Sequence, residues 1–197
     1  MPQFPEAQFL VSAWQPHQFP ADEGREVAFV GRSNAGKSSA LNAITGRRDL
    51  ARTSKTPGRT QLINFFELKT GQRLADLPGY GYAKVPAEMQ RHWRELLSSY
   101  VGSRGSLAGL IIVIDSRRGL TDFDRQMLEW VEERSITTHL LLTKADKLNR
   151  SESSKTLREV QAQSAGAATA QLFSAVTKAG VDEARGWVLG TLAAKRQ

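Results

Sequence analysis

The feature that most constrains this chain is a glycine-rich loop that ends in Lys and Ser. It matches the pattern G-x-x-x-x-G-K-[ST] at every fixed position and reads Gly31-Arg32-Ser33-Asn34-Ala35-Gly36-Lys37-Ser38. The apolar run 27–30 precedes the loop as a short strand, and residues 38–45 follow it as a helix. In that setting the glycines let the backbone wrap around an anion, and N–H groups at the helix N-terminus bind phosphate oxygens. The loop therefore predicts a site for a nucleoside triphosphate.

Two side chains of this loop and one further motif have predicted roles at the phosphates. Lys37 can bridge the β- and γ-phosphates, and the Ser38 hydroxyl can ligate Mg²⁺. The second motif, Asp76-Leu77-Pro78-Gly79, ends a predicted strand 39 residues after Lys37. Its Asp can hold a Mg²⁺-bound water, and the Gly79 N–H can meet the γ-phosphate. The alternative for so short a motif is an ordinary turn at the end of a strand.

Strands and helices alternate along the chain. Apolar runs predict strands at 27–30, 62–68, 73–76, 107–114, 138–142 and 170–173. Helical spacing of apolar residues predicts helices at 38–45, 86–101, 121–134, 151–165 and 180–194. This alternation indicates an α/β domain, residues 25–197, with a mostly parallel sheet. The proline-containing segment 1–24 is expected to be an irregular extension that packs on the domain through Phe9, Leu10, Val11 and Trp14.

The composition excludes several classes of protein. The 197 residues suffice for one domain, and the absence of Cys excludes a disulfide scaffold, Cys-ligated zinc and a thiol nucleophile. The longest apolar run, 107–114, is far short of the roughly 18–20 residues that span a membrane. Glu6, Gln8 and Gln15 interrupt any export signal. We expect a cytoplasmic protein without a membrane span, and a monomer.

Two motifs after later strands point to the base of the nucleotide. Thr143-Lys144-Ala145-Asp146 follows the strand 138–142. A carboxylate at position 146 can accept hydrogen bonds from N1–H and the N2 amino group of guanine, which discriminates against other bases by roughly 10⁴. The stem of Lys144 can cover the base, and Phe173-Ser174-Ala175 can offer a backbone N–H to the guanine oxygen. The alternatives are a solvated cap for Asp146 and an ordinary loop for residues 173–175.

Taken in order, these motifs resemble those of a known family. GRSNAGKS, TPGRTQ, DLPGYGYA, TKAD and FSA extend from Gly31 to Ala175, as in Era-like GTPases. More narrowly, the chain resembles the EngB family (also called YihA or YsxC) of bacterial ribosome-biogenesis GTPases. The narrower resemblance depends on TPGRTQLINFF at 56–66, DLPGYGYAKV at 76–85, and Thr143 in place of the superfamily's usual Asn.

The resemblance implies a fold and further site residues. The fold would be the Ras-like, three-layer P-loop GTPase fold, with a mostly parallel six-stranded sheet and helices on both faces. Thr60 would be the second protein ligand of Mg²⁺ beside Ser38, with Asp76 acting through water, and Lys37, Thr60 and Gly79 would be the catalytic groups. The first switch around the γ-phosphate would be Gly58, Arg59, Thr60, Gln61 and Leu62. Because Thr143 lacks the amide of the usual Asn, we expect fast nucleotide exchange.

Hydrolysis of GTP is expected to be slow. Ras-like proteins place a water-orienting Gln directly after the D-x-x-G glycine, whereas this chain has Tyr80, followed by Gly81-Tyr82. A phenol is a poor mimic of that amide, so we expect turnover near or below about 10⁻⁴ s⁻¹ without a partner. Asn34 lies where K⁺-stimulated relatives carry a K⁺-coordinating Asn, although an Asn can also simply cap the loop. Arg59 is an alternative group that can reach the phosphates.

The formal charge of +7 is concentrated in one segment. Eight basic and two acidic residues lie between Arg25 and Thr60. The nucleotide needs only Lys37 of these cations, whereas a run leads through the first switch: Arg47, Arg48, Arg52, Lys55 and Arg59. A basic segment of this kind suits a phosphate backbone. With the resemblance, it predicts ribosomal RNA of the large subunit as the partner and association with the ribosome; the alternative is a solvated positive face.

Three classes of function remain open at this point. The first is a GTP-hydrolysing switch in assembly of the large ribosomal subunit, which the resemblance also links to normal cell division and septation. The second is a P-loop kinase or ATPase, which nucleotide specificity distinguishes. The third is a GTP-dependent binding module in cell division without direct rRNA contact, which multiple-turnover release of phosphate would exclude.

Overall fold

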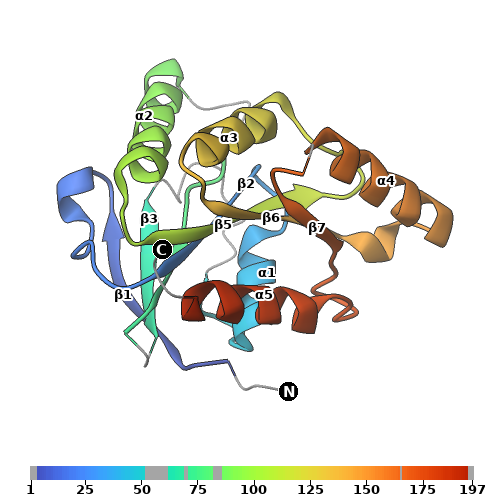
Figure 1. Cartoon of the computed structure of the whole chain (residues 1–197), viewed down its shortest axis with the longest axis horizontal. Helices are drawn as coiled ribbons and strands as arrows, with labels where there is room; N and C mark the ends of the chain where they lie inside the picture. The colour runs from blue at the N-terminus through green and yellow to red at the C-terminus, as the bar shows by residue number, and fades with distance from the viewer. Residues whose placement is uncertain (1–3, 52–61, 69–70, 82–85, 165, 195–197) are drawn as a thin grey trace.

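The computed structural model describes residues 4–51, 62–68, 71–81, 86–164 and 166–194. In these residues, five helices cover both faces of a seven-stranded sheet (Figure 1). The strands are β1 (Ala7–Ala13), β2 (Glu26–Gly31), β3 (Ile63–Leu68), β4 (Arg73–Asp76), β5 (Leu107–Asp115), β6 (Thr137–Thr143) and β7 (Thr169–Leu172). The helices are α1 (Lys37–Thr45), α2 (Ala87–Ser103), α3 (Asp122–Glu133), α4 (Arg150–Gln163) and α5 (Val181–Ala193). Short 3₁₀ turns lie at Pro16–Gln18 and Ala145–Lys147.

The sheet is mostly parallel, with the strand order β1-β3-β4-β2-β5-β6-β7. Strands β4, β2, β5, β6 and β7 run parallel, whereas β3 pairs antiparallel with both β4 and β1. The α/β fold predicted from the sequence is confirmed, and the ends of the predicted elements lie within two residues of the observed ends. Because the carboxyl ends of parallel strands meet at one edge of a sheet, the loops after β2, β4, β5, β6 and β7 gather there.

Two buried apolar clusters hold the three layers together. Helices α2, α3 and α4 pack on one face of the sheet, and α1 and α5 pack on the other (Figure 1). Strand β5 is buried between the layers from Gly109 onwards, which explains its continuous apolar run. None of the described helices combines the length and the apolar character needed to cross a membrane.

The N-terminal segment corrects the predicted number of strands. Residues 7–13 form β1 at the edge of the sheet, in register with β3 from Ala7 opposite Leu68 to Ala13 opposite Ile63. The sheet therefore has seven strands rather than six. This strand was missed because Ala favours strands weakly and the apolar residues do not alternate strictly. The domain boundary between residues 24 and 25 stays a prediction.

The predicted anchors of this segment contact the domain to different extents. Val11 packs against a buried apolar cluster, and the Phe9 ring centroid lies 6.1 Å from that of Phe66. Phe9 is 60% exposed and Leu10 is 42% exposed, so neither is a buried anchor. Leu10 lies where the register with β3 shifts between Phe9 and Val11, as in a β-bulge. Trp14 does contact the domain, because its ring stacks on His92 of α2 with 4.0 Å between the centroids.

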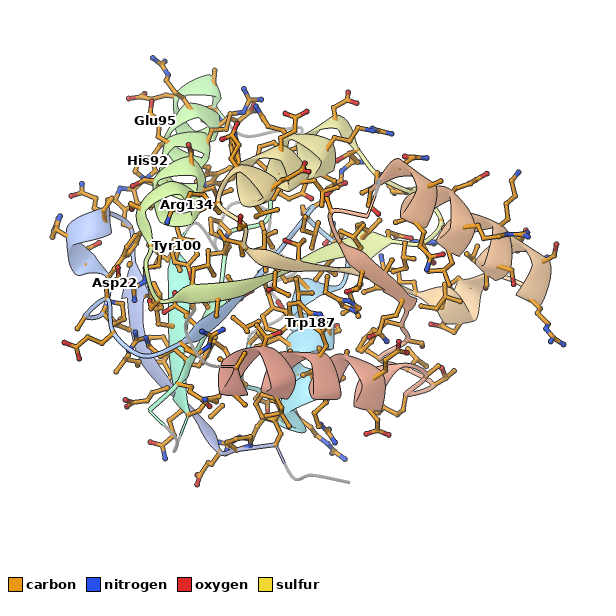
Figure 2. All side chains as sticks on the ribbon, viewed as in Figure 1. Asp22, His92, Glu95, Tyr100, Arg134 and Trp187 are labelled. Carbon is orange, nitrogen blue, oxygen red and sulfur yellow. The ribbon has the colours of Figure 1, made fainter. Side chains whose placement is uncertain are left out.

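A buried ionic cluster lies at the end of β2 that is opposite the glycine-rich loop. Glu26 has no exposed surface, and its Oε2 lies 3.1 Å from Nε of Arg73 and 3.2 Å from Nη2 of Arg104. The Tyr100 hydroxyl donates to the same carboxylate. Burial, and then the adjacent Glu26 charge, raise the pKa of Tyr100 well above its ordinary value. Tyr100 points from α2 toward the sheet (Figure 2).

The same two arginines attach the segment before β2. Arg104 donates through Nη1 to the Pro20 carbonyl at 2.8 Å, and Arg73 donates through Nη2 to the Ala21 carbonyl at 2.9 Å. The Arg104 guanidinium also lies over the rings of Phe19 and Phe65, at 5.8 and 5.5 Å from the centroids. Glu26 therefore neutralises two cations that join the N-terminal segment, the sheet and α2.

Removing the charge of Glu26 tests how much this cluster contributes to the free energy of unfolding. Glu26→Gln removes the buried carboxylate between Arg73 and Arg104 and leaves Arg104 only its longer, 3.7 Å contact with the half-exposed Asp22, so we expect the free energy of unfolding to fall by about 3–5 kcal/mol. Urea denaturation measures it. The control is Glu95→Ala, an exposed glutamate on α2 (Figure 2), for which we expect a change within about 0.5 kcal/mol. Equal losses in the two variants would contradict the role of the cluster.

Candidate nucleotide-binding site

The loop Gly31–Ser38 joins β2 to α1 and has the backbone of an anion-binding loop. Gly36 caps α1 in the left-handed region with φ of 97°. A Cβ at Gly31 would lie 2.5 Å from the Val113 carbonyl oxygen, so only glycine allows this approach of β2 to β5. No side chain caps the N-terminus of α1, whereas α3 and α4 each begin with a capping box. The first N–H groups of α1 thus suit a phosphate.

The second phosphate motif lies directly along this loop. Leu77 donates its N–H to the Phe29 carbonyl at 2.9 Å, and Ser33 donates to the Tyr80 carbonyl at 2.8 Å. A Cβ at Gly79 would lie 3.5 Å from both Gly31 O and Ser33 N, so the two loops pass within van der Waals contact. The sheet therefore carries residues 76–80 to the place where the sequence predicts the γ-phosphate.

Lys37 and Asp76 meet between these two loops. The Lys37 ammonium donates to Asp76 Oδ1, and the two side chains are only 10% and 4% exposed. A cation beside the anion-binding loop suits phosphate, and an Asp carboxylate and a Ser hydroxyl are oxygen ligands of the kind that Mg²⁺ prefers. The donor set present thus fits a Mg²⁺-nucleotide, with Lys37 for the phosphates and Ser38 and Asp76 on the metal side.

The described residues hold no cluster of three His, Cys, Asp or Glu side chains that could bind a metal by itself. Magnesium commonly relies on few protein ligands together with phosphate oxygens and water. The predicted ligand Thr60 lies outside the described residues, as do Gly58, Arg59 and Gln61. Leu62 is described and half-buried immediately before β3. The predicted roles of the first-switch residues stay predictions.

The predicted base motifs face each other across the ends of β6 and β7. The Ser174 hydroxyl donates to Asp146 Oδ1 at 2.6 Å, and the Ala145 N–H donates to the Phe173 carbonyl at 3.1 Å. The Ser174 hydrogen bond lowers the pKa of Asp146, so its carboxylate is ionised at neutral pH. An ionised carboxylate is an acceptor, as recognition of guanine N1–H and N2 requires.

Lys144 and Thr143 connect the base motif to the phosphate loop. Lys144 Nζ donates to the Asn34 carbonyl at 2.6 Å. The buried Thr143 hydroxyl lies within hydrogen-bond reach of the Ala35 carbonyl and 3.0 Å from the Ile114 carbonyl. Thr143 thus reaches the phosphate loop from the position where the wider superfamily has Asn.

Comparison with known proteins identifies the family of this chain. The sequence profile of the 50S ribosome-binding GTPases matches residues 26–144. A probable GTP-binding protein EngB of Coxiella burnetii (strain RSA 331 / Henzerling II) is 52% identical over 187 residues, which cover 93% of this chain and 91% of that protein. The chain belongs to the EngB family of GTP-binding proteins. The family member of Stenotrophomonas maltophilia (strain K279a) is 50% identical over 94% of this chain and 95% of its own length.

Solved structures share the fold at lower identity. A crystal structure of a probable EngB protein superposes with a TM-score of 0.70 at 20% identity, over 85% of this chain and 98% of that one. Era in complex with MgGDPNP and nucleotides 1506–1542 of 16S ribosomal RNA gives a TM-score of 0.68 at 18% identity, over 89% of this chain and 59% of that one. These likenesses confirm the P-loop GTPase fold of this EngB-family chain.

Sequence reasoning missed Asp115, which organises one wall of the site. This residue ends β5, is 6% exposed, and binds Lys144 Nζ at 2.9 Å and Arg117 Nη2 at 2.7 Å. The Arg117 hydrogen bonds hold the pKa of the Asp115 carboxyl well below its usual range. With Asn34 and Lys144, these residues line a cavity beside the phosphate loop. The signal for this residue in the sequence was an Asp directly at the carboxyl end of an apolar strand.

Tyr80 has a different environment from the water-orienting Gln whose position it takes. It is 6% exposed, its ring lies 4.3 Å from that of Phe123, and its hydroxyl donates to Asp124. The hydroxyl is therefore engaged with α3, and the prediction that Tyr80 does not replace that Gln stays a prediction. Tyr82 lies outside the described residues.

Asp124 was not predicted and carries an unusual proton affinity. It is 2% exposed and accepts from the Thr121 N–H at 2.7 Å and the Thr121 hydroxyl at 2.6 Å. Burial raises the pKa of its carboxyl from 3.8 to about 6. The folded state thus binds the proton more tightly than the unfolded state does.

The raised pKa predicts a pH dependence of stability. Because the folded-state pKa exceeds the unfolded-state value, protonated Asp124 stabilises the fold, and this contribution is lost as the pH rises from about 4 to about 6. Asp124→Asn should remove this component from the free energy of unfolding, measured by urea denaturation at several pH values. The exposed neighbour Asp122→Asn is the control and should keep the wild-type profile. An unchanged pH profile in Asp124→Asn would contradict the assignment.

Proposed function

We propose that this EngB-family protein is a GTP-dependent switch that hydrolyses GTP slowly and acts in assembly of the large ribosomal subunit. The observation that carries the proposal is the contact between its two recognition elements. Lys144, beside the guanine-selecting Asp146, binds the Asn34 carbonyl of the phosphate loop at 2.6 Å. A base held at Asp146 and phosphates held at Lys37 would then belong to one ligand.

Different residues of the site bind different parts of the Mg²⁺-nucleotide. Lys37 exchanges its contact with Asp76 for the β- and γ-phosphate oxygens, and the N–H groups at the start of α1 bind the β-phosphate. The Gly79 N–H turns to the γ-phosphate. Ser38 and Thr60, with Asp76 through water, would hold Mg²⁺, which would neutralise charge on the phosphates. Because the Tyr80 hydroxyl is engaged with Asp124, it does not orient the attacking water, which supports slow hydrolysis.

Base specificity provides the sharpest test of this assignment. Asp146→Asn replaces an acceptor by an amide that suits the 2-oxo group of xanthine, so GDP affinity should fall by about 10²-fold or more while XDP affinity rises. Titration calorimetry with GDP, XDP and ADP measures the change. Asp182→Asn, exposed at the start of α5, should leave the preference for GDP intact. Tight binding of ADP by the wild type would favour a kinase or ATPase instead.

Potassium bound at Asn34 is the proposed activator of GTP hydrolysis. Asn34 is exposed on the phosphate loop with a φ of 62°, and its carbonyl is taken by Lys144, which leaves the side-chain oxygen for a cation. A K⁺ there would add positive charge beside the β- and γ-phosphates. Single-turnover hydrolysis should be faster in KCl than in NaCl, and Asn34→Ala should remove the difference. Equal wild-type rates in the two salts would contradict the proposal.

Ribosomal RNA is the proposed partner of the basic segment. Arg47 and Arg48 are exposed directly after α1, and Arg47 Nη1 lies 3.7 Å from Glu6 Oε1. Arg52, Lys55 and Arg59 lie outside the described residues. Support comes from this local charge and from the ribosome-binding family that the profile describes. A requirement in cell division and septation would follow from defective ribosomes.

Salt dependence tests direct contact with RNA. If about four cations contact phosphates, affinity for large subunits should fall by about 10²-fold between roughly 50 and 200 mM salt. Co-sedimentation of the GTP-bound protein with large subunits measures it. Arg48→Ala should weaken binding and flatten the slope, whereas Arg158→Ala, exposed on α4, should match the wild type. A flat wild-type salt dependence would support the alternative, a binding module without rRNA contact.

A further inference from the structure

A buried polar network lies beneath the base loop and takes no part in the site described above. His139 on β6 and Gln171 on β7 are each 3% exposed. His139 Nε2 lies 2.9 Å from Gln171 Oε1, and His139 Nδ1 lies 2.7 Å from Thr169 Oγ1. Gln171 Nε2 donates to the Gly180 carbonyl at 2.8 Å. The network therefore joins two strands to Gly180, the residue that caps the N-terminus of α5.

The chemistry of these groups gives every hydrogen bond a direction. The Gly180 carbonyl can only accept, so the amide nitrogen of Gln171 faces it and the amide oxygen faces His139. His139 must then carry its proton on Nε2, and Nδ1 accepts from the Thr169 hydroxyl. Burial lowers the pKa of His139, which keeps the ring neutral as this arrangement requires.

Gly180 is held against β7 more closely than any other residue type allows. Its φ is 73°, and a Cβ there would lie 2.2 Å from the Leu172 carbonyl oxygen and 2.7 Å from Gln171 Nε2. The segment 173–180 thus leaves the end of β7 and returns to it, and the Gln171 amide bonds the point of return. From α5, Trp187 points toward the sheet (Figure 2) and stacks on His139 with 5.1 Å between the ring centroids.

The segment closed in this way is the one that orients the guanine-selecting carboxylate. Within it, the Ser174 N–H donates to the Ala179 carbonyl at 2.9 Å, and Ser174 Oγ accepts from the Thr177 N–H at 3.1 Å. The same hydroxyl donates to Asp146 Oδ1 at 2.6 Å. Asp146 is therefore bonded to the loop, and the bond between Gln171 and Gly180 closes the loop on β7.

We propose that Gln171 is a positioning residue for guanine selection, which it serves by bonding the Gly180 carbonyl and closing the loop that holds Ser174 against Asp146. It does not touch the nucleotide. Because the phosphate loop and α1 are built on β2, loss of this bond should weaken recognition of the base and spare the phosphates. The inference rests on the proposed function, since it assigns a residue to the guanine site of that function.

Gln171→Glu tests the proposal with almost no change of shape. The carboxylate can still accept from His139, but it offers no donor to Gly180 and repels that carbonyl. We expect the Kd for GDP to rise about tenfold, as loss of one well-placed hydrogen bond predicts, while the Kd for pyrophosphate with Mg²⁺ stays within about twofold. The ratio of GDP to IDP affinity should also fall, because IDP lacks the N2 amino group that Asp146 accepts from. Titration calorimetry gives all three values.

The matched control removes the other end of the same network. Thr169→Val deletes the donor to His139 Nδ1 but keeps the bond from Gln171 to Gly180, so GDP affinity should stay within about twofold of the wild type. If Gln171→Glu fails to unfold cooperatively, Gln171→Met replaces it, because Met fills the volume without a donor. Equal losses of GDP and pyrophosphate affinity, or an unchanged GDP affinity, would overturn the role of Gln171. A wild type that binds no GDP would instead overturn the proposed function.

Discussion

The pairing of β2 with β4 on one side and β5 on the other is the interaction on which the site depends. Because these strands are parallel, the loops that follow them leave the sheet at one edge. The strand order also changes direction at β2, with β4 on one side and β5 on the other. The approach of Gly31 to Val113 is close enough to exclude a side chain. The phosphate loop, the Asp76 motif and the base motif therefore lie together at this edge of the sheet.

Contacts between loops then make one site from separate motifs. Lys144 joins the base motif to the phosphate loop through the Asn34 carbonyl and is itself held by the Asp115 carboxylate. At the opposite end of β2, Glu26 neutralises Arg73 and Arg104 and so attaches the N-terminal segment. The central strand thus ends in a ligand site at one edge and in a buried ionic cluster at the other.

Much of the fold and of the site followed from local pattern. The spacing of glycines around Lys37 predicted a strand, a loop and a helix, because only that geometry aims several N–H groups at one anion. Runs of apolar residues predicted β5 and β6, since strands buried between two layers are apolar on both faces. Strand β1 was not recognisable, because its pairing with β3 depends on residues fifty or more positions away and not on its own periodicity.

The sequence by itself determined the class of fold and the phosphate loop with Lys37 and Ser38, and it predicted Asp146 as the residue that selects guanine, because each depends on residue chemistry at short spacing. Only the tertiary structure decided which groups support them. The Tyr80 hydroxyl binds Asp124, and Gln171 closes the loop at Gly180. These partners come together through the strand order and the packing of α3 and α5. A local sequence pattern does not show which distant group a buried side chain will bond.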